Sequence, residues 1–233
     1  MHGFKVGENV YSYSWDNPQG GFYAQYVAVP AERVGHMPMQ LTMQQAGAIA
    51  TTGLTALQGI DNFLKLKSGQ SVIIHGASGG VGTLAIQFAK LRGARVLATA
   101  SGADGFALAK KLGADAVVDA RSGNITAAAH DFAPGGVDAV LALVGGDALE
   151  RCIAALHPGG RVAFPHGVSP PPHSRSGITI AGYNAVASPV EFSHLNAAIA
   201  ASHLQVYPLA QAAQAQRRVE TGHVLGKVIL QIE

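Results

Sequence analysis

The chain alternates short apolar runs with segments whose apolar residues repeat at helical spacing. In the clearest instance, the β-branched and apolar residues Val72–Ile74 lead into the small residues 76–82. Apolar side chains then follow the i, i+3, i+4, i+7 spacing of one helix face, at Val81, Leu84, Ala85 and Phe88. This stretch predicts a strand, a tight turn and a helix.

The same alternation continues toward residue 182. We expect further strands at 95–100, 116–118, 137–144, 161–164 and 178–182, and helices at 103–112, 125–132 and 147–156. Residues 137–144 are almost continuously apolar, as in a strand buried on both faces. Strands alternating with helices in this way predict an α/β fold with a doubly wound parallel sheet.

The two ends of the chain have a different pattern. Residues 1–44 have β character, with strands expected at 3–11 and 22–29, whereas 43–63 has a helical composition. Toward the other end we expect helices at 191–204 and 208–219, then a strand at 224–230 that returns to pair with the N-terminal segment. The predicted organisation is therefore a β-rich N-terminal segment (1–44), an α/β domain (45–185) and a C-terminal return to that segment (186–233).

Composition narrows the function classes. Hydrophobic residues make up 48% of the chain and charged residues 13%, which allows a large core. The net charge is +2 with no basic run, so we expect no nucleic-acid partner. Neither a signal-peptide pattern nor an uninterrupted apolar span is visible, so we expect a cytoplasmic protein without a membrane partner. The single cysteine, Cys152, excludes an internal disulfide and is expected to be a small buried hydrophobe.

The turn after residue 75 resembles a dinucleotide fingerprint. Ala77-x-Gly79-x-x-Gly82 is G-x-G-x-x-G with one small substitution. Gly79 would let the backbone approach a pyrophosphate, and Gly82 would let the helix pack closely on the strand. The residues predicted to line the pyrophosphate are Ala77, Ser78, Gly79, Gly80, Val81 and Gly82. An ordinary glycine-rich connection between a strand and a helix is the alternative.

The end of the second strand bears on the choice of cofactor. An NAD site usually places a carboxylate there for the ribose 2′-hydroxyl, but residues 99–102 contain none. We therefore expect NADPH rather than NADH. Ser101 either donates a hydrogen bond to the 2′-phosphate or caps the following helix, and both readings stay open. Asp104 nearby is unfavourable for a phosphate, and no cationic partner is evident.

Longer motifs connect the chain to a known family. Residues 69–82, followed by Gln87 and Lys90, resemble the signature of the zinc-independent medium-chain dehydrogenase/reductases, in the quinone oxidoreductase (ζ-crystallin-like) branch. Further landmarks of that branch occur in the same order at 4–10, 52–56, 112–115, 158–162 and 222–227. The resemblance covers nearly the whole chain.

The resemblance implies a Rossmann domain flanked by an incomplete GroES-like β lobe built from both chain ends. It implies hydride transfer from NADPH to a small electrophile, either a quinone or an activated C=C bond of an enone or alkenal. The residues that it places around the nicotinamide and its ribose are Thr55, Val144, Gly145, Pro165, His166 and Gly167. It also implies a homodimer that pairs through the edge strand at 178–181.

The chain departs from the family's pattern at three places. It begins where the catalytic lobe is already half built, so we expect either a fragment or a natural short form. The usual lysine after the second strand corresponds to Gly105, and a tyrosine near the adenosine corresponds to Ala120. An NADPH-binding protein with little or no turnover, acting structurally or with a partner, is therefore the alternative function.

The sequence gives little evidence for a metal site or for a catalytic acid or base. The position of a zinc ligand in the alcohol-dehydrogenase branch is held by Thr51, and the ten histidines show no ligand spacing, so we expect no metal. Tyr11, Tyr13, Tyr23 and His166 are candidate proton donors, although aromatic residues in strands more often pack. No catalytic residue is assigned.

Overall fold

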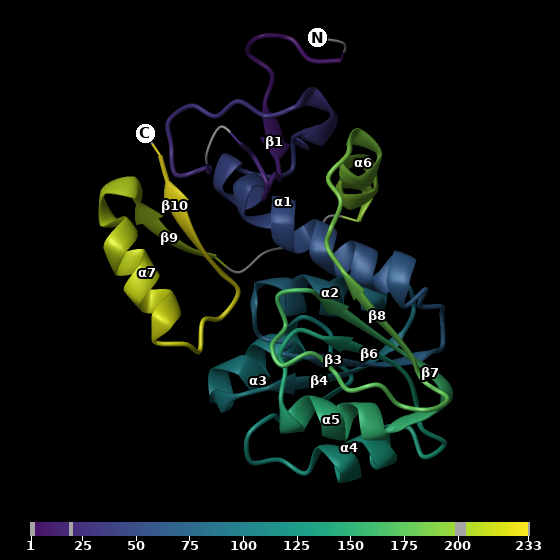
Figure 1. The fold of residues 1–233 in the computed structure, drawn as a ribbon. Helices are drawn as coiled ribbons and strands as arrows, with labels where there is room; N and C mark the ends of the chain where they lie inside the picture. Colours follow the sequence, from purple (N-terminus) through teal and green to yellow (C-terminus); the bar gives the residue numbers. More distant parts are fainter. Residues whose placement is uncertain (1–2, 19–20, 199–203, 233) are drawn as a thin grey trace.

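A six-stranded parallel sheet forms the centre of the computed structural model, which describes residues 3–18, 21–198 and 204–232. Its strands are β3 (Ser71–His75), β4 (Arg95–Ala100), β5 (Ala116–Asp119), β6 (Val137–Ala142), β7 (Leu156–Pro165) and β8 (Thr179–Tyr183). They lie in the order β5-β4-β3-β6-β7-β8, so the direction of winding reverses between β3 and β6 (Figure 1). This is the Rossmann order, and the predicted doubly wound sheet is confirmed.

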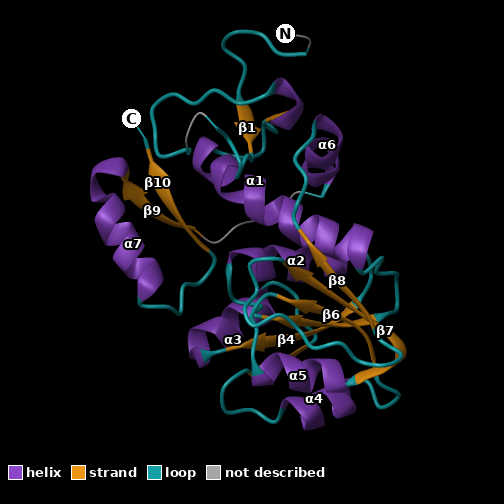
Figure 2. Ribbon diagram, in the orientation of Figure 1, coloured by secondary structure: helices purple, strands orange, loops and turns teal. Residues whose placement is uncertain are grey.

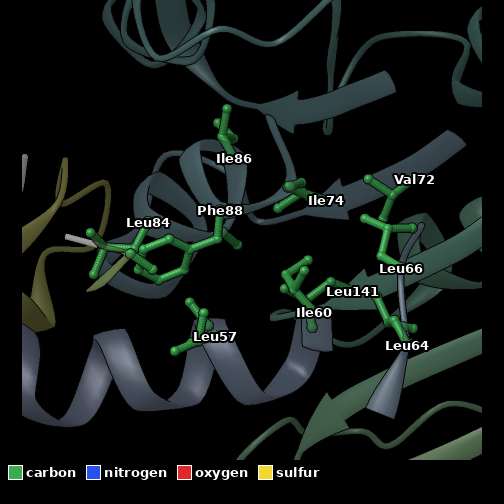
Figure 3. Close-up of a cluster of buried hydrophobic side chains, with 14 of the residues drawn as sticks. Leu57, Ile60, Leu64, Leu66, Val72, Ile74, Leu84, Ile86, Phe88 and Leu141 are labelled. Atoms are coloured by element: carbon green, nitrogen blue, oxygen red, sulfur yellow. The ribbon is translucent and has the colours of Figure 1, made fainter. Parts of the chain in front are cut away.

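Helices cover both faces of the sheet (Figure 2). The helices α1 (Met43–Gln58), α2 (Gly80–Leu91) and α3 (Gly102–Lys111) contribute to one apolar cluster, and α4 (Ile125–Phe132) and α5 (Asp147–Ala154) contribute to the other. Figure 3 shows Leu57 and Ile60 facing Phe88 of α2 and the strand residues Ile74 and Leu141. Because both faces are covered, every residue of β3 is buried.

Helix α1 connects the sheet to the rest of the molecule. It starts in a capping box, in which the Thr42 hydroxyl accepts from the Gln45 N–H at 3.2 Å and the Gln45 side chain accepts from the Thr42 N–H at 2.9 Å. It ends in a π-helical turn, η2 (Gly59–Phe63), where a side chain at Gly59 would collide with the Tyr183 hydroxyl of β8, 2.4 Å from the added carbon. This contact seats α1 against the sheet.

The chain ends form two small sheets outside the Rossmann domain (Figure 1). At the N-terminal end, β1 (Val10–Ser12) pairs antiparallel with β2 (Val34–His36), which follows a short 3-10 helix, η1 (Ala31–Arg33). At the C-terminal end, β9 (Leu204–Pro208) pairs in parallel with β10 (Lys227–Gln231). The helices of this end are α6 (Pro189–Ala197), η3 (Leu209–Gln211) and α7 (Ala212–Glu220).

Several predicted elements at the chain ends were wrong. Residues 22–29 are not a strand, and Tyr23 and Tyr26 are 74% and 92% exposed. The C-terminal strand pairs with β9 rather than with the N-terminal segment, because β9, α7 and β10 form a local strand–helix–strand unit. Strand β9 itself lies where the end of one helix and the start of the next were expected. The C-terminal strand β10 instead contacts α1, where Gln44 donates a hydrogen bond to Gln231 at 3.0 Å.

Candidate cofactor site

The glycine turn lies at the switch point of the sheet, between the carboxyl end of β3 and the first turn of α2. Gly76 has a φ of +87°, which turns the chain sharply after the strand. A side chain on Gly82 would come within 2.4 Å of the Gly76 carbonyl oxygen and 2.6 Å of the Ala77 Cα. Glycine at 82 therefore lets α2 pack directly on the turn, as the fingerprint predicts.

Gly79 has a different role in the same turn. It is the N-cap residue of α2, and it has no side chain that could cap the helix. A carbon added there would meet only the Gly76 carbonyl oxygen, at an ordinary 3.6 Å. The surrounding protein atoms therefore leave room for a side chain at position 79. The first turn of α2 carries N–H groups without intrahelical acceptors, and the helix dipole favours an anion beside them.

Most of the other predicted residues lie at the carboxyl ends of neighbouring strands, on the same edge of the sheet. Ser101 follows β4, Val144 and Gly145 follow β6, and Pro165 ends β7 with His166 and Gly167 after it. A side chain on Gly76 would lie 2.8 Å from Val144 Cγ2, so these two strand ends touch. Thr55 comes instead from α1, where its hydroxyl donates to the Thr51 carbonyl at 2.8 Å.

Two of these residues pack against neighbouring parts of the chain. A side chain on Gly145 would lie 2.2 Å from the carbonyl oxygen of Pro170, so the loop after β7 closes over that position. The His166 ring packs edge-on against Phe164 and lies next to Gly182 of β8. The structure therefore gathers the strand-end residues but leaves Thr55, with its buried side chain, on the helix.

Ser101 occupies the N-cap position of α3, but its side chain makes no capping hydrogen bond. Of the two readings of this residue, helix capping by the hydroxyl is therefore wrong. Gly105, one turn into α3, lies beside Ser78: an added carbon would be 3.4 Å from Ser78 Cβ and 3.5 Å from Ala100 Cβ. The ends of β3 and β4 and the start of α3 thus lie next to one another.

The C-terminal segment also reaches the glycine turn, which sequence reasoning missed. Gly226 donates its N–H to the Ser78 carbonyl at 2.9 Å and forms a parallel bridge with Gly79. The Lys227 side chain runs beside Gly80, where an added carbon would be 3.4 Å from Lys227 Cδ. Burial lowers the pKa of Lys227. The signal in the sequence was the motif at 222–227, which identified the family but not this contact.

A buried histidine lies beneath the turn. His75, the last residue of β3, is 2% exposed, and its Nδ1 is 2.8 Å from the Thr99 hydroxyl on β4. Its Nε2 has no hydrogen-bond partner among the described residues. Burial, together with the nearby Arg151 charge, lowers the pKa of His75 to about 4. The Sγ atom of Cys152 lies 3.8 Å from His75 Nδ1. The predicted burial of Cys152 is confirmed.

The candidate proton donors lie in different surroundings. Tyr11 is buried, its ring packs on Phe192 and its hydroxyl donates to Asn196, which is a packing role. Burial raises the pKa of Tyr13, whereas Tyr23 is exposed to solvent. Among these four candidates, His166 is exposed and lies at the carboxyl edge of the sheet, directly after β7. Across residues 3–18, 21–198 and 204–232, no cluster of three or more His, Cys, Asp or Glu side chains is placed to hold a metal.

Comparison with known proteins identifies the family. Residues 80–181 match the model described as zinc-binding dehydrogenase. The sequence is 31% identical to the quinone oxidoreductase of Sus scrofa, over 97% of this chain and 73% of that protein. The chain belongs to the quinone oxidoreductase-type medium-chain dehydrogenase/reductases. No helix of the described residues is both long and apolar enough to pass through a membrane.

Two further matches differ from this chain in length. The spectinabilin polyketide synthase system protein NorB of Streptomyces orinoci is 41% identical over 58% of this chain and 6% of its own length. The structure of mycobacterial Rv1454c complexed with NADPH has a TM-score of 0.80 and 28% identity, and the match covers 89% of this chain and 70% of that one. This chain thus spans only part of the length of these relatives.

The residues present fit a dinucleotide. The turn offers the amides of α2 and the small residues that close approach requires, and the Lys227 side chain runs beside Gly80. The Ser101 hydroxyl is not used in capping, and no carboxylate stands between Thr99 and Gly102. These features match the expectation of a nicotinamide dinucleotide at this edge of the sheet.

Proposed function

We propose that this protein is an NADPH-dependent reductase that transfers a hydride to a quinone or to an activated C=C bond, without zinc. The main support for the proposal is the glycine turn at the switch point of the sheet, together with the end of β4, which has no carboxylate. Membership in the quinone oxidoreductase-type family supports the reaction class. The small-molecule electrophile, a cytoplasmic location and a homodimer are parts of the same proposal.

The protein's contribution is to bind and orient. Residues 77–82 and Lys227 hold the pyrophosphate, and Ser101 donates to the 2′-phosphate. The residues placed around the nicotinamide are Thr55, Val144, Gly145, Pro165, His166 and Gly167. When bound, the reduced nicotinamide supplies the hydride. Catalysis is then mainly orientation and exclusion of water, and the product oxygen takes its proton from solvent.

The side chains present favour a reaction without zinc. Thr51 stands on α1 at the position of a zinc ligand in the alcohol-dehydrogenase branch, and a threonine hydroxyl is a poor zinc ligand. Electrophiles such as quinones do not need a Lewis acid to accept a hydride. Activity in the presence of a chelator is therefore expected to equal activity without it.

Mixing the protein with NADPH and 1,2-naphthoquinone or a 2-alkenal tests the proposal. We expect oxidation of NADPH, followed as loss of absorbance at 340 nm. The Gly79→Ala variant serves as the control for cofactor binding, because it alters the turn without crowding the fold. No oxidation with either electrophile would contradict the reductase.

A second candidate, an NADPH-binding protein with little turnover, is favoured by the exposed N-terminal segment. Trp15, Tyr23 and Tyr26 are 71%, 74% and 92% exposed, so the small β1–β2 lobe leaves large aromatic side chains uncovered. This candidate predicts that NADPH raises the melting temperature without being consumed. The two candidates therefore give opposite results in the oxidation assay and the same result in the melting assay.

A further inference from the structure

A histidine from the C-terminal segment lies over the start of α3, next to Ser101. His223 Nε2 is 2.9 Å and 3.1 Å from the two carboxylate oxygens of Asp104. The imidazole covers Gly102, where an added carbon would be 3.0 Å from His223 Cε1. This contact joins residues 119 positions apart, and it stands at the strand end where a Rossmann fold binds the adenosine ribose.

The backbone of His223 is held in an uncommon conformation to make this contact. Its φ is +50°, in the left-handed region that non-glycine residues rarely adopt. The Arg218 guanidinium fixes the loop by donating to the Gly222 carbonyl at 2.9 Å and to the His223 carbonyl at 3.0 Å. Strain of this kind is retained mostly where a side chain must be aimed at a functional position.

The charges at this strand end are arranged to tolerate an anion. The Asp104 carboxylate would repel a 2′-phosphate, but His223 occupies that carboxylate through a hydrogen bond, which lowers the pKa of Asp104. Asp119, at the end of β5, is engaged by the N–H groups of Arg121 and Ser122, both at 2.8 Å. An imidazole has two ring nitrogens, so Nε2 can hold Asp104 while Nδ1 serves a ligand.

We propose that His223, paired with Asp104, is the residue that recognises the 2′-phosphate and so selects NADPH over NADH. This inference rests on the proposed function, because it assigns a residue to the same cofactor site. It places the selectivity on the C-terminal segment rather than on the Rossmann domain. It also accounts for Gly105, where the lysine expected after the second strand is missing.

Isothermal titration of the whole chain with four probes tests the assignment: NADPH, NADH, 2′,5′-ADP and 5′-AMP. His223→Gln keeps a hydrogen-bonding group but removes the imidazole ring. We expect this variant to lose about tenfold in affinity for NADPH and for 2′,5′-ADP, the usual value of one charge-assisted hydrogen bond. Its affinities for NADH and 5′-AMP are expected to stay at the wild-type values, which shows that the site remains folded.

Other outcomes overturn the assignment. Equal losses for NADPH and NADH would make His223 a structural latch, and no loss would remove it from the site. Arg121→Gln is the matched control, since Arg121 is an exposed cation at the next strand end. A loss of selectivity in that variant alone would transfer the role to Arg121. Wild-type protein that binds none of the four probes would overturn the proposed function as well, whereas unselective binding overturns only the role of His223.

Discussion

At the scale of single residues, the two glycines of the fingerprint are held by different constraints. Gly82 has no room for a side chain because backbone atoms of the turn lie 2.4 Å and 2.6 Å from an added carbon. Gly79 has that room inside the protein, with 3.6 Å to its nearest neighbour. Glycine at 82 is therefore a requirement of the fold, whereas glycine at 79 leaves space for a ligand.

Alanine at each position separates the two roles. We expect Gly82→Ala to lower the free energy of unfolding by roughly 1–3 kcal/mol, the usual cost of overpacking. Gly79→Ala, its matched control, should leave stability nearly unchanged and weaken cofactor binding, because the methyl group occupies the approach of the pyrophosphate. Urea unfolding and calorimetric titration with NADPH measure the two effects. Equal destabilisation by both variants would contradict this division.

His75 links stability to pH. Its pKa is about 4 in the folded chain and 6.5 when exposed, so the neutral form is the folded one. The stability that it contributes is complete above pH 6.5 and is lost as the pH falls toward 4, because the unfolded chain takes up the proton first. We expect the free energy of unfolding to fall by about 2 kcal/mol between pH 7 and pH 5 from this group alone.

Urea unfolding at pH 7, 6 and 5 measures this loss, with His75→Asn for comparison. The variant is expected to be less stable at every pH, because it leaves a cavity. The informative quantity is the change with pH, which should be about 2 kcal/mol smaller in the variant. Parallel curves for the two proteins would show that His75 titrates normally.

At the scale of elements, some helices and strands are determined by local sequence pattern, and others depend on long-range contacts. Helix α4 and strand β4 have the predicted bounds because their apolar periodicity and their neighbouring turns act over a few residues. Residues 22–29 have the composition of a strand, but the adjacent β1 pairs with β2 instead. A strand needs a partner backbone, and composition does not supply one.

Lys227, the first residue of β10, is a candidate ligand-binding residue whose burial costs stability. The Lys227 ammonium is partly desolvated, which lowers its pKa, and its stem lies against the turn at Gly80. We expect Lys227→Met to weaken NADPH and NADH binding by equal factors, about tenfold, because the pyrophosphate is common to both. The ligand-free variant should be as stable as the wild type or more so, since a buried charge is removed.

Calorimetric titration and thermal unfolding of Lys227→Met check both expectations, with Lys227→Arg as the charge-conserving control. The equal loss for both cofactors distinguishes this residue from His223, whose variant should affect NADPH alone. A variant with unchanged affinity would place the pyrophosphate away from Lys227.

At the scale of the whole molecule, β8 is the edge strand of the six-stranded sheet. Edge strands offer unpaired backbone groups, and natural proteins usually cover them. We expect a homodimer in which two copies pair through β8, and light scattering should give twice the mass of one chain. Ile180→Pro removes a backbone donor from this edge and is expected to yield a monomer. A monomeric wild-type mass would contradict the pairing.

The Rossmann domain could be predicted from sequence because its signals are local. Each strand and helix between residues 71 and 183 carries its own periodicity, and the glycine turn shows its geometry through the residue types that it demands. Ser101 followed from the expected end of the second strand, whereas Val144 followed from the family resemblance. The loss of capping at Ser101 needed the hydrogen bonds of the structure.

The sequence by itself therefore determined the sheet, the turn and the absence of a carboxylate beside it. The tertiary structure decided what approaches that turn. Gly226 and Lys227 reach the turn, and His223 reaches the start of α3, each from more than 100 residues away. No periodicity or spacing in the sequence reports such contacts. The physical reason is that local patterns reflect backbone preference and burial, whereas docking of a distant segment depends on how the finished surfaces fit together.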